Sequence, residues 1–105
     1  MADYVLLYSG GGMPEGEAET AAIMQAWSAW YESLGAAVKD GGNPFTPAVK
    51  MIAADGTVSD GDASWTSGYS ILKADSMDAA VEMAKGCPVL KGGASITVFE
   101  TFEVM

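Results

Sequence analysis

Two helical patterns alternate with apolar extended runs along this sequence, and that order leaves few folds open. The first helix is indicated by a hydrophobic stripe at i, i+4, i+7, i+8 and i+11. Its members are Ile23, Trp27, Trp30, Tyr31 and Leu34. The second helix is indicated by its ends, since Asp75 or Ser76 can cap the N-terminus and Lys85-Gly86 closes it. We therefore expect two amphipathic helices, each with one face to bury.

Extended segments flank and separate these helices. They are indicated over 4–8, over 37–40 with a continuation at 47–53, over 68–72 and over 96–104, between glycines or prolines. Asp55-Gly56 is a tight-turn signal, and the polar stretch from Thr57 to Ser67 is expected to be irregular. The resulting βαββαβ order predicts a single α+β domain over residues 1–105. Its fold is a ferredoxin-like antiparallel sheet with both helices on one face.

The opposite face of such a sheet is left without a cover. The first extended run, Tyr4-Val5-Leu6-Leu7-Tyr8, is apolar on both faces, and Phe99 lies opposite Val98 on the last strand. An exposed apolar sheet face usually marks an interface. We therefore expect the protein to be a homodimer joined through this face.

The charge composition excludes several classes of function. The chain has 14 acidic residues, five lysines, no arginine and no histidine, with a net charge of −9. Nucleic acids and anionic membranes require basic surface, so neither is expected as a partner. A Ser-His-Asp triad is impossible without histidine, and a zinc site lacks its commonest ligand. We expect no metal and no cofactor. Because no signal-peptide or transmembrane pattern is visible, the expected location is cytoplasmic.

Short motifs spread along the chain resemble a known family. They are Tyr4-Val5-Leu6-Leu7-Tyr8, Trp27 and Trp30, Gly41-Gly42, Asp60-Gly61, Gly68-Tyr69, Cys87-Pro88, and Gly92-Gly93 before Ile96-Thr97-Val98. Together these resemble the YCII-related family, also called DGPF-domain proteins, over nearly the whole chain. The resemblance implies a ferredoxin-like domain that pairs into a dimeric α/β barrel. Most members have no assigned activity, and a few relatives are small-molecule lyases in the breakdown of chlorinated aromatics.

Two departures from the family pattern bear on function. Asp60-Gly61 is followed by Asp62-Ala63 instead of Pro-Phe, so the signature loop is half kept. Some members also carry a catalytic pair, made of a histidine on the first helix and an aspartate after the second strand. Here Trp27 lies near the histidine position, and Asp40 lies where the aspartate is expected. The histidine-dependent chemistry of the family therefore does not carry over.

Two carboxylates are candidate catalytic residues. Alternation along the last strand places Glu100 in an apolar row with Ile96, Val98, Phe102 and Val104. A buried carboxylate has to be hydrogen-bonded, paired or protonated, which occurs in functional cavities. The alternative is that a bulge or the sheet edge turns Glu100 into water. Asp40, just before Gly41-Gly42, either acts as an acid or base or organises a turn through local backbone hydrogen bonds.

Aromatic side chains are the candidates for binding a flat ligand, namely Trp27, Trp30, Trp65 and Tyr69. Aromatics at helical spacing are also ordinary core residues, and Trp65, on a polar loop, would equally suit a dimer anchor. The glycine run at 10–12 lacks the Lys-Ser/Thr of a phosphate loop, and the acidic run from 55 to 62 fails the EF-hand frame. Cys87 is either a small buried filler or a reactive thiol.

Two functions stay open on these grounds. The first is a small-molecule-binding domain with a pocket between helices and sheet, lined by Trp27, Trp30, Tyr69 and Glu100. It would carry at most a minor carboxylate-based activity at Asp40 or Glu100. The alternative is a non-catalytic dimer that serves as an accessory or interaction domain, with a filled core and no pocket. Whether the protein is an enzyme is left undecided.

Overall fold

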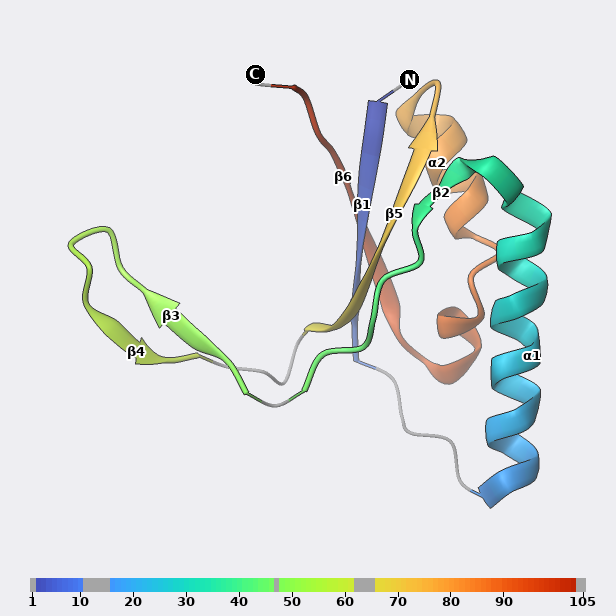
Figure 1. Ribbon diagram of the computed structural model, residues 1–105, viewed down its shortest axis with the longest axis horizontal. Helices are drawn as coiled ribbons and strands as arrows, with labels where there is room; N and C mark the ends of the chain where they lie inside the picture. Colours follow the sequence, from blue (N-terminus) through green and yellow to red (C-terminus); the bar gives the residue numbers. More distant parts are fainter. Residues whose placement is uncertain (1, 11–15, 47, 62–65, 104–105) are drawn as a thin grey trace.

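The computed structural model describes residues 2–10, 16–46, 48–61 and 66–103, and Figure 1 shows its arrangement. The elements, in chain order, are β1 (Ala2–Ser9), α1 (Gly16–Leu34), β2 (Val38–Asp40), β3 (Lys50–Ile52), β4 (Val58–Asp60), β5 (Thr66–Ala74), α2 (Met77–Ala84) and β6 (Ser95–Glu100). The short 3-10 helices η1 (Gly35–Ala37) and η2 (Pro88–Gly92) follow α1 and α2. The expected mixed α+β class is confirmed.

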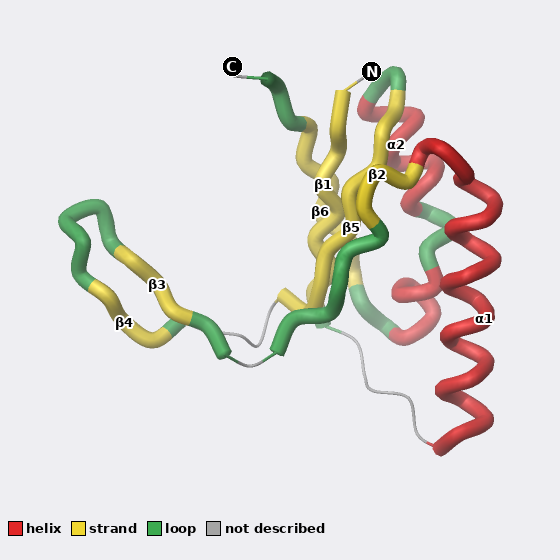
Figure 2. The backbone as a smooth tube through the Cα atoms, viewed as in Figure 1, coloured by secondary structure: helices red, strands yellow, loops and turns green. Residues whose placement is uncertain are grey.

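The main sheet has four strands in the order β2-β5-β1-β6, and every neighbouring pair is antiparallel. The two long strands β1 and β5 lie at its centre, and α1 and α2 both pack on the same face (Figures 1 and 2). This is the arrangement of a ferredoxin-like fold. The other face of the sheet is open among the described residues. We call it the open face.

The helix ends follow their sequence signals. Ser76 caps α2, because its hydroxyl accepts a hydrogen bond of 3.1 Å from the backbone N–H of Ala79. α1 ends before Gly35, whose φ of 56° lies in the left-handed region that glycine adopts readily. The apolar stripe of α1 turns inward as expected, with Trp30 its buried member.

The segment between β2 and β5 differs from the expectation of irregular structure over 57–67. Val58–Asp60 pairs with Lys50–Ile52 in a separate two-stranded sheet. The turn at Asp55-Gly56 makes this pairing possible, since Gly56 has φ of 91° and Ala53 N–H donates to the Thr57 carbonyl at 2.7 Å. The turn signal was therefore right. The prediction of an irregular stretch was wrong for β4, and also for Thr66 and Ser67, which begin β5.

The last strand is shorter than the expected 96–104, because β6 ends at Glu100. Beyond it the chain bends, and both the N–H and the hydroxyl of Thr101 bind the Asp3 carbonyl, at 2.9 and 2.8 Å. Phe102 is 83% exposed. The alternation that placed Glu100 in a continuous apolar row therefore stops at Glu100 itself.

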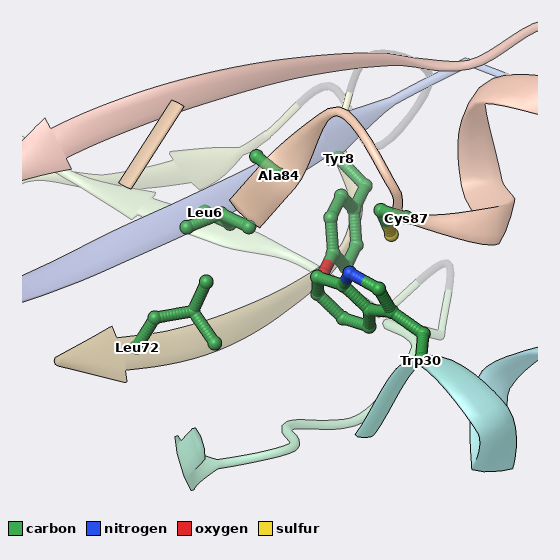
Figure 3. Packing of buried hydrophobic residues seen from close by; sticks show 6 residues of the cluster. All are labelled: Leu6, Tyr8, Trp30, Leu72, Ala84 and Cys87. Atoms are coloured by element: carbon green, nitrogen blue, oxygen red, sulfur yellow. The ribbon is translucent and has the colours of Figure 1, made fainter. Parts of the chain in front are cut away.

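The core lies between the sheet and the two helices. Alternate residues of β1 and β5 point into it, and they are Tyr4, Leu6, Tyr8, Ser70, Leu72 and Ala74. Figure 3 shows Leu6 and Leu72 on neighbouring strands, with Trp30, Ala84 and Cys87 closing the cluster from the helix side. Because Ala80 and Ala84 are small, α2 can pack closely on the sheet.

Candidate functional site

The space between the helices and the sheet is filled by aromatic side chains of the chain itself. Trp27, Trp30 and Tyr31 of α1 stand in mutual contact, with ring centroids 5.4–5.7 Å apart. Tyr8 of β1 meets Trp27 edge-on at 5.7 Å. Such edge-on and tilted contacts are favourable for aromatic rings in a core. These four residues therefore form packed interior where a ligand pocket was expected.

Hydrogen bonds satisfy the polar ends of three of these rings, those of Tyr8, Trp30 and Tyr31. The Tyr8 hydroxyl donates to Ser70 Oγ at 2.6 Å, and the Ser70 hydroxyl donates to the Gly41 carbonyl at 2.8 Å. Tyr31 donates to the same carbonyl at 3.0 Å, and Trp30 Nε1 donates to the Met83 carbonyl at 3.0 Å. Among the described residues, no buried side-chain nitrogen or oxygen lacks a partner. This interior has no polar group left over for a ligand.

This network was missed by sequence reasoning. The available signal was Tyr8, which alternation places on the buried face of β1 and whose hydroxyl needs a partner there. Burial raises the pKa of the Tyr8 phenol well above its ordinary value, although the hydrogen bond to Ser70 works in the opposite direction. Burial also raises the pKa of the Cys87 thiol, against a backbone hydrogen bond at Val89 and the neighbouring Tyr8. Both groups are therefore neutral core residues at physiological pH.

The open face of the sheet is apolar and only partly covered. Two cross-strand rows run over it. Phe99, Val5 and Ile71 are aligned in one row, and Thr97, Leu7 and Tyr69 in the next. Phe99 is half exposed, at 50%. Row partners of this kind stabilise a sheet, yet they leave a flat apolar surface facing away from the helices.

One aromatic pair stands out at the end of this face. The ring of Phe45 stacks on that of Tyr69, with centroids 5.7 Å apart and planes 18° from parallel. The loop that carries Phe45 is held against β5, since Phe45 N–H donates to the Ser67 carbonyl at 2.8 Å and Pro44 bridges Gly68. Phe45 is still 46% exposed. The pair forms a stacking platform that remains accessible.

The two candidate carboxylates lie on opposite edges of the sheet. Asp40 ends β2 and Glu100 ends β6, with β5 and β1 between them. Three strand spacings separate the two edges by about 14 Å. Asp40 Oδ1 accepts a hydrogen bond of 2.8 Å from Gly42 N–H, which is the turn-forming alternative considered for it. Glu100 is exposed and accepts a long 3.4 Å hydrogen bond from the Tyr4 hydroxyl.

The predicted ligand-binding residues are divided between the two faces. Trp27 and Trp30 belong to the interior beneath α1, whereas Tyr69 lies on the open face and Glu100 at an edge. Trp65 lies outside the described residues. The structure therefore does not bring these side chains together as one lining within a chain. Their roles in binding or catalysis stay predictions.

Two shallow hollows occur elsewhere on the described surface. One, of about 440 Å³, is lined by Ala48, Val49, Lys50, Asp60 and Gly61 at the base of β3–β4. The other, of about 420 Å³, lies along the first turns of α1 between Gly16 and Met24. Neither includes a residue that was singled out as a candidate for catalysis or ligand binding.

The described ranges hold neither a cluster of metal-binding side chains nor a helix suited to a membrane. No group of three or more acidic or cysteine side chains there could hold a metal ion. No helix in that part of the chain is both long and apolar enough to span a bilayer.

Fold and site together define a small ferredoxin-like α+β protein with a filled helix–sheet interior and an apolar open face. A similar solved structure is the 5-chloro-2-hydroxyhydroquinone dehydrochlorinase TftG from Burkholderia phenoliruptrix AC1100, in complex with 2,5-dihydroxybenzoquinone. It matches with a TM-score of 0.53 at 22% sequence identity, covering 94% of this chain and 93% of that chain. At that identity the likeness shows the fold.

The sequence comparisons add no closer assignment. No protein-family profile matches the chain, and no curated protein sequence is significantly similar to it. Membership of the YCII-related family therefore stays a prediction, supported by the shared fold alone.

Proposed function

We propose that the protein is a homodimeric small-molecule-binding domain whose ligand site lies on the open face, at the Phe45–Tyr69 platform. The observation that carries the proposal is the uncovered apolar sheet face, which ends in an accessible stacked pair. A second copy of the chain covers this face and excludes water from the platform. The proposed ligand site therefore lies on the open face, whereas the sequence predicts a pocket on the helix side of the sheet.

The large exposed surface area of the single chain supports a second copy as the cover of the open face. The chain exposes 7381 Å². A folded monomer of 10.8 kDa is expected to expose about 5,500 Å², so the excess is about 1,800 Å². The radius of gyration, 15.3 Å, likewise exceeds the value of about 13 Å for a compact chain of this length. Obligate dimers bury about 1,000–2,500 Å² per partner, which matches the excess.

The charge of the chain predicts how dimerisation depends on salt. Each copy carries a net charge of −9, so association brings together two like-charged molecules. Salt screens this repulsion, while the apolar contact on the open face is insensitive to screening. The dimer dissociation constant is therefore expected to fall as sodium chloride is raised from 20 to 300 mM, measured by sedimentation or light scattering.

The class of ligand follows from the platform and the charge. Stacked aromatic rings bind flat ligands by their faces, and ring faces also attract cations. The chain has no arginine to clamp an anion through two hydrogen bonds, and its net charge of −9 repels anions. A neutral or cationic aromatic ring is therefore favoured over an anionic one. The 2,5-dihydroxybenzoquinone held by TftG is also a flat six-membered ring, which supports the flat shape of the ligand but not its charge.

An NMR titration with hydroquinone, and with benzoate as the anionic counterpart, tests the proposal. We expect hydroquinone to shift the signals of Tyr69 and its neighbours, and benzoate to shift them much less. Phe45→Ala should weaken hydroquinone binding at least about 5-fold, because one side of the stack is lost. Phe102→Ala is the matched control, since Phe102 is exposed but lies beyond β6, away from the platform.

A non-catalytic accessory dimer is the second candidate function. The filled interior favours it, because every buried polar side chain described there is already satisfied. If the protein is a dimer and no ring compound binds, this second function replaces the first. A monomer at micromolar concentration would overturn both. Equal hydroquinone affinity in Phe45→Ala and Phe102→Ala would show that the ligand does not bind at the Phe45–Tyr69 platform.

A further inference from the structure

The hairpin formed by β3 and β4 projects from the rest of the molecule. We call residues 48–61 the arm. In Figures 1 and 2 the arm extends from the side of the open face, away from both helices. Every arm residue from 48 to 60 is exposed. Along the direction in which the arm extends, the molecule measures 44 Å, although it is 17 Å thick.

The arm carries apolar side chains on both of its faces. Ile52 and Val58 are cross-strand partners on one face, 72% and 60% exposed. Met51, on the other face, is 60% exposed and shares that face with Val49. Lys50 and Asp60 form an ion pair across the strands. An arm that remained in water would gain nothing from such apolar residues, so their presence indicates a surface that becomes covered.

The arm is also too small to be stable alone. Each strand has three residues, and the ladder contains three residue pairs. An isolated two-stranded hairpin in water is at best marginally stable, and usually needs a third strand or a packed layer. The contacts that hold the arm in place are therefore expected to come from another surface.

The length of the arm identifies that surface. The base of the arm at Ala48 and its turn at Asp55 are seven residue steps apart, a reach of up to about 23 Å in an extended strand. Two sheets packed face to face lie about 10 Å apart. A second copy seated on the open face would therefore lie beside the arm, and the arm would reach past its sheet to its flank.

We propose that the arm is a clasp that docks on the second copy of the chain through Ile52 and Val58. Under two-fold symmetry each copy's arm holds the other, so the clasp forms twice. The excess exposed surface of about 1,800 Å² thus includes the arm as well as the open face. The clasp rests on the proposed homodimer but not on the proposed ligand.

A double substitution tests the clasp without disturbing the hairpin. Ile52→Thr with Val58→Thr keeps both residues β-branched, so the strand preference is retained while apolar surface is lost. Two apolar side chains lose hydrocarbon in each copy, four per dimer, so the dimer should dissociate at least about 100-fold more readily. Thr57→Ser, which lies next to Val58 in the chain but changes neither member of the pair, is the control and should leave the dissociation constant unchanged.

Hydrogen exchange provides an independent readout. The Ala53 amide donates to the Thr57 carbonyl at 2.7 Å, within the arm. Its exchange rate therefore reports how often the hairpin of the arm opens. In the dimer this amide should exchange at least about 10-fold more slowly than in the dissociated chain. The dissociated chain is obtained with Leu7→Asp on the open face, or by dilution of wild type if that variant does not fold.

The outcomes separate the clasp from the dimer. A wild-type monomer, with no concentration dependence, would overturn the dimer and the clasp together. A dimer in which the double substitution leaves the dissociation constant unchanged, and in which Ala53 exchanges as fast as in the monomer, would overturn the clasp alone. Formation of open-ended aggregates through the arm, instead of a closed dimer, would also overturn it.

Discussion

The Tyr8 hydroxyl donates a 2.6 Å hydrogen bond to Ser70 Oγ, joining the two central strands beneath α1. Ser70 is completely buried, and its hydroxyl donates a hydrogen bond to the Gly41 carbonyl. A buried serine next to a buried tyrosine is stable only because each supplies the other's missing partner. The pair accounts for the absence of an orphan polar group in the described interior, and hence for placing the ligand site on the other face.

Replacing Ser70 should lower the free energy of unfolding, because the hydrogen bonds from Tyr8 to Ser70 and from Ser70 to Gly41 are lost. Ser70→Ala leaves the Tyr8 hydroxyl without its acceptor and removes one donor from the Gly41 carbonyl. We expect a loss of about 1–3 kcal/mol in the free energy of unfolding, measured with urea. Ser33→Ala is the control, since Ser33 lies on the exposed side of α1 and bonds only its own helix, and should change stability by less than about 0.5 kcal/mol. Equal effects in the two variants would refute the role given to Ser70.

Alanine substitutions at Gly42 and Gly56 distinguish the energetic cost of a steric clash from that of backbone strain alone. Its φ is 75°, and a Cβ there would lie 1.7 Å from the Tyr69 carbonyl oxygen. Gly56 has a similar φ of 91°, but a Cβ there would meet nothing within 4 Å. We expect Gly56→Ala to cost about 1–2 kcal/mol, and Gly42→Ala at least about 3 kcal/mol, in urea unfolding. Similar losses would mean that the close approach of the Gly42 loop to β5 is absent in solution.

The fold was predictable to the extent that its signals are local. The inward stripe of α1, the cap at Ser76 and the turn at Asp55-Gly56 each involve residues close together in the sequence, and each was recognised correctly. The missed strand β4 has three residues, and its pattern of one apolar residue between polar ones resembles a loop. Only pairing with β3 reveals it, and pairing is a tertiary property.

The candidate site was harder to predict because it depends on which face a residue occupies. Tyr69 and Trp30 are both aromatic, but a sheet separates them, since Tyr69 lies on the open face and Trp30 packs beneath the helices. Glu100 was placed in a buried row by alternation, but the strand ends there. Such errors arise because sequence spacing gives a side chain's relative orientation along one strand, and leaves open where that strand ends or which edge it occupies.

Asp40 provides a test of turn formation against catalysis. Its carboxylate accepts a hydrogen bond from Gly42 N–H, and an asparagine amide oxygen can replace it in that role. Asp40→Asn should therefore retain nearly full stability, whereas Asp40→Ala should lose about 1 kcal/mol. Thermal and urea unfolding measure both. An Asp40→Asn variant that folds normally but loses hydroquinone binding or turnover would instead assign Asp40 a chemical role.

The ion pair between Asp3 and Lys39 predicts a pH dependence of stability. The hydrogen bond from Lys39 lowers the pKa of the Asp3 carboxyl below its ordinary 3.8, and the same contact raises the pKa of Lys39 above 10.5. A carboxyl with a lowered folded-state pKa adds stability above about pH 4 and loses it as the pH falls through the lowered value. The stability difference between wild type and Asp3→Asn should therefore shrink from pH 6 to pH 2.

A double-mutant cycle controls for the other charges around Asp3. In a Lys39→Met background the largest cause of the lowered Asp3 pKa is gone. The effect of Asp3→Asn should then vary much less with pH. A pH dependence of the same size with and without Lys39 would show that the pair does not form in solution.

Cys87 should behave as a core residue and not as a nucleophile. Its side chain is 2% exposed, Figure 3 shows it beside Tyr8, and burial raises the pKa of its thiol. The thiolate is the reactive form, so iodoacetamide at pH 8 should modify Cys87 only when the chain opens. We expect a rate at least about 100-fold below that of an exposed thiol introduced by Ser28→Cys on α1 in the same molecule. Comparable rates for the two thiols would instead indicate an accessible, activated cysteine at the end of α2, and the small-molecule site would then have to be sought on the helix side of the sheet.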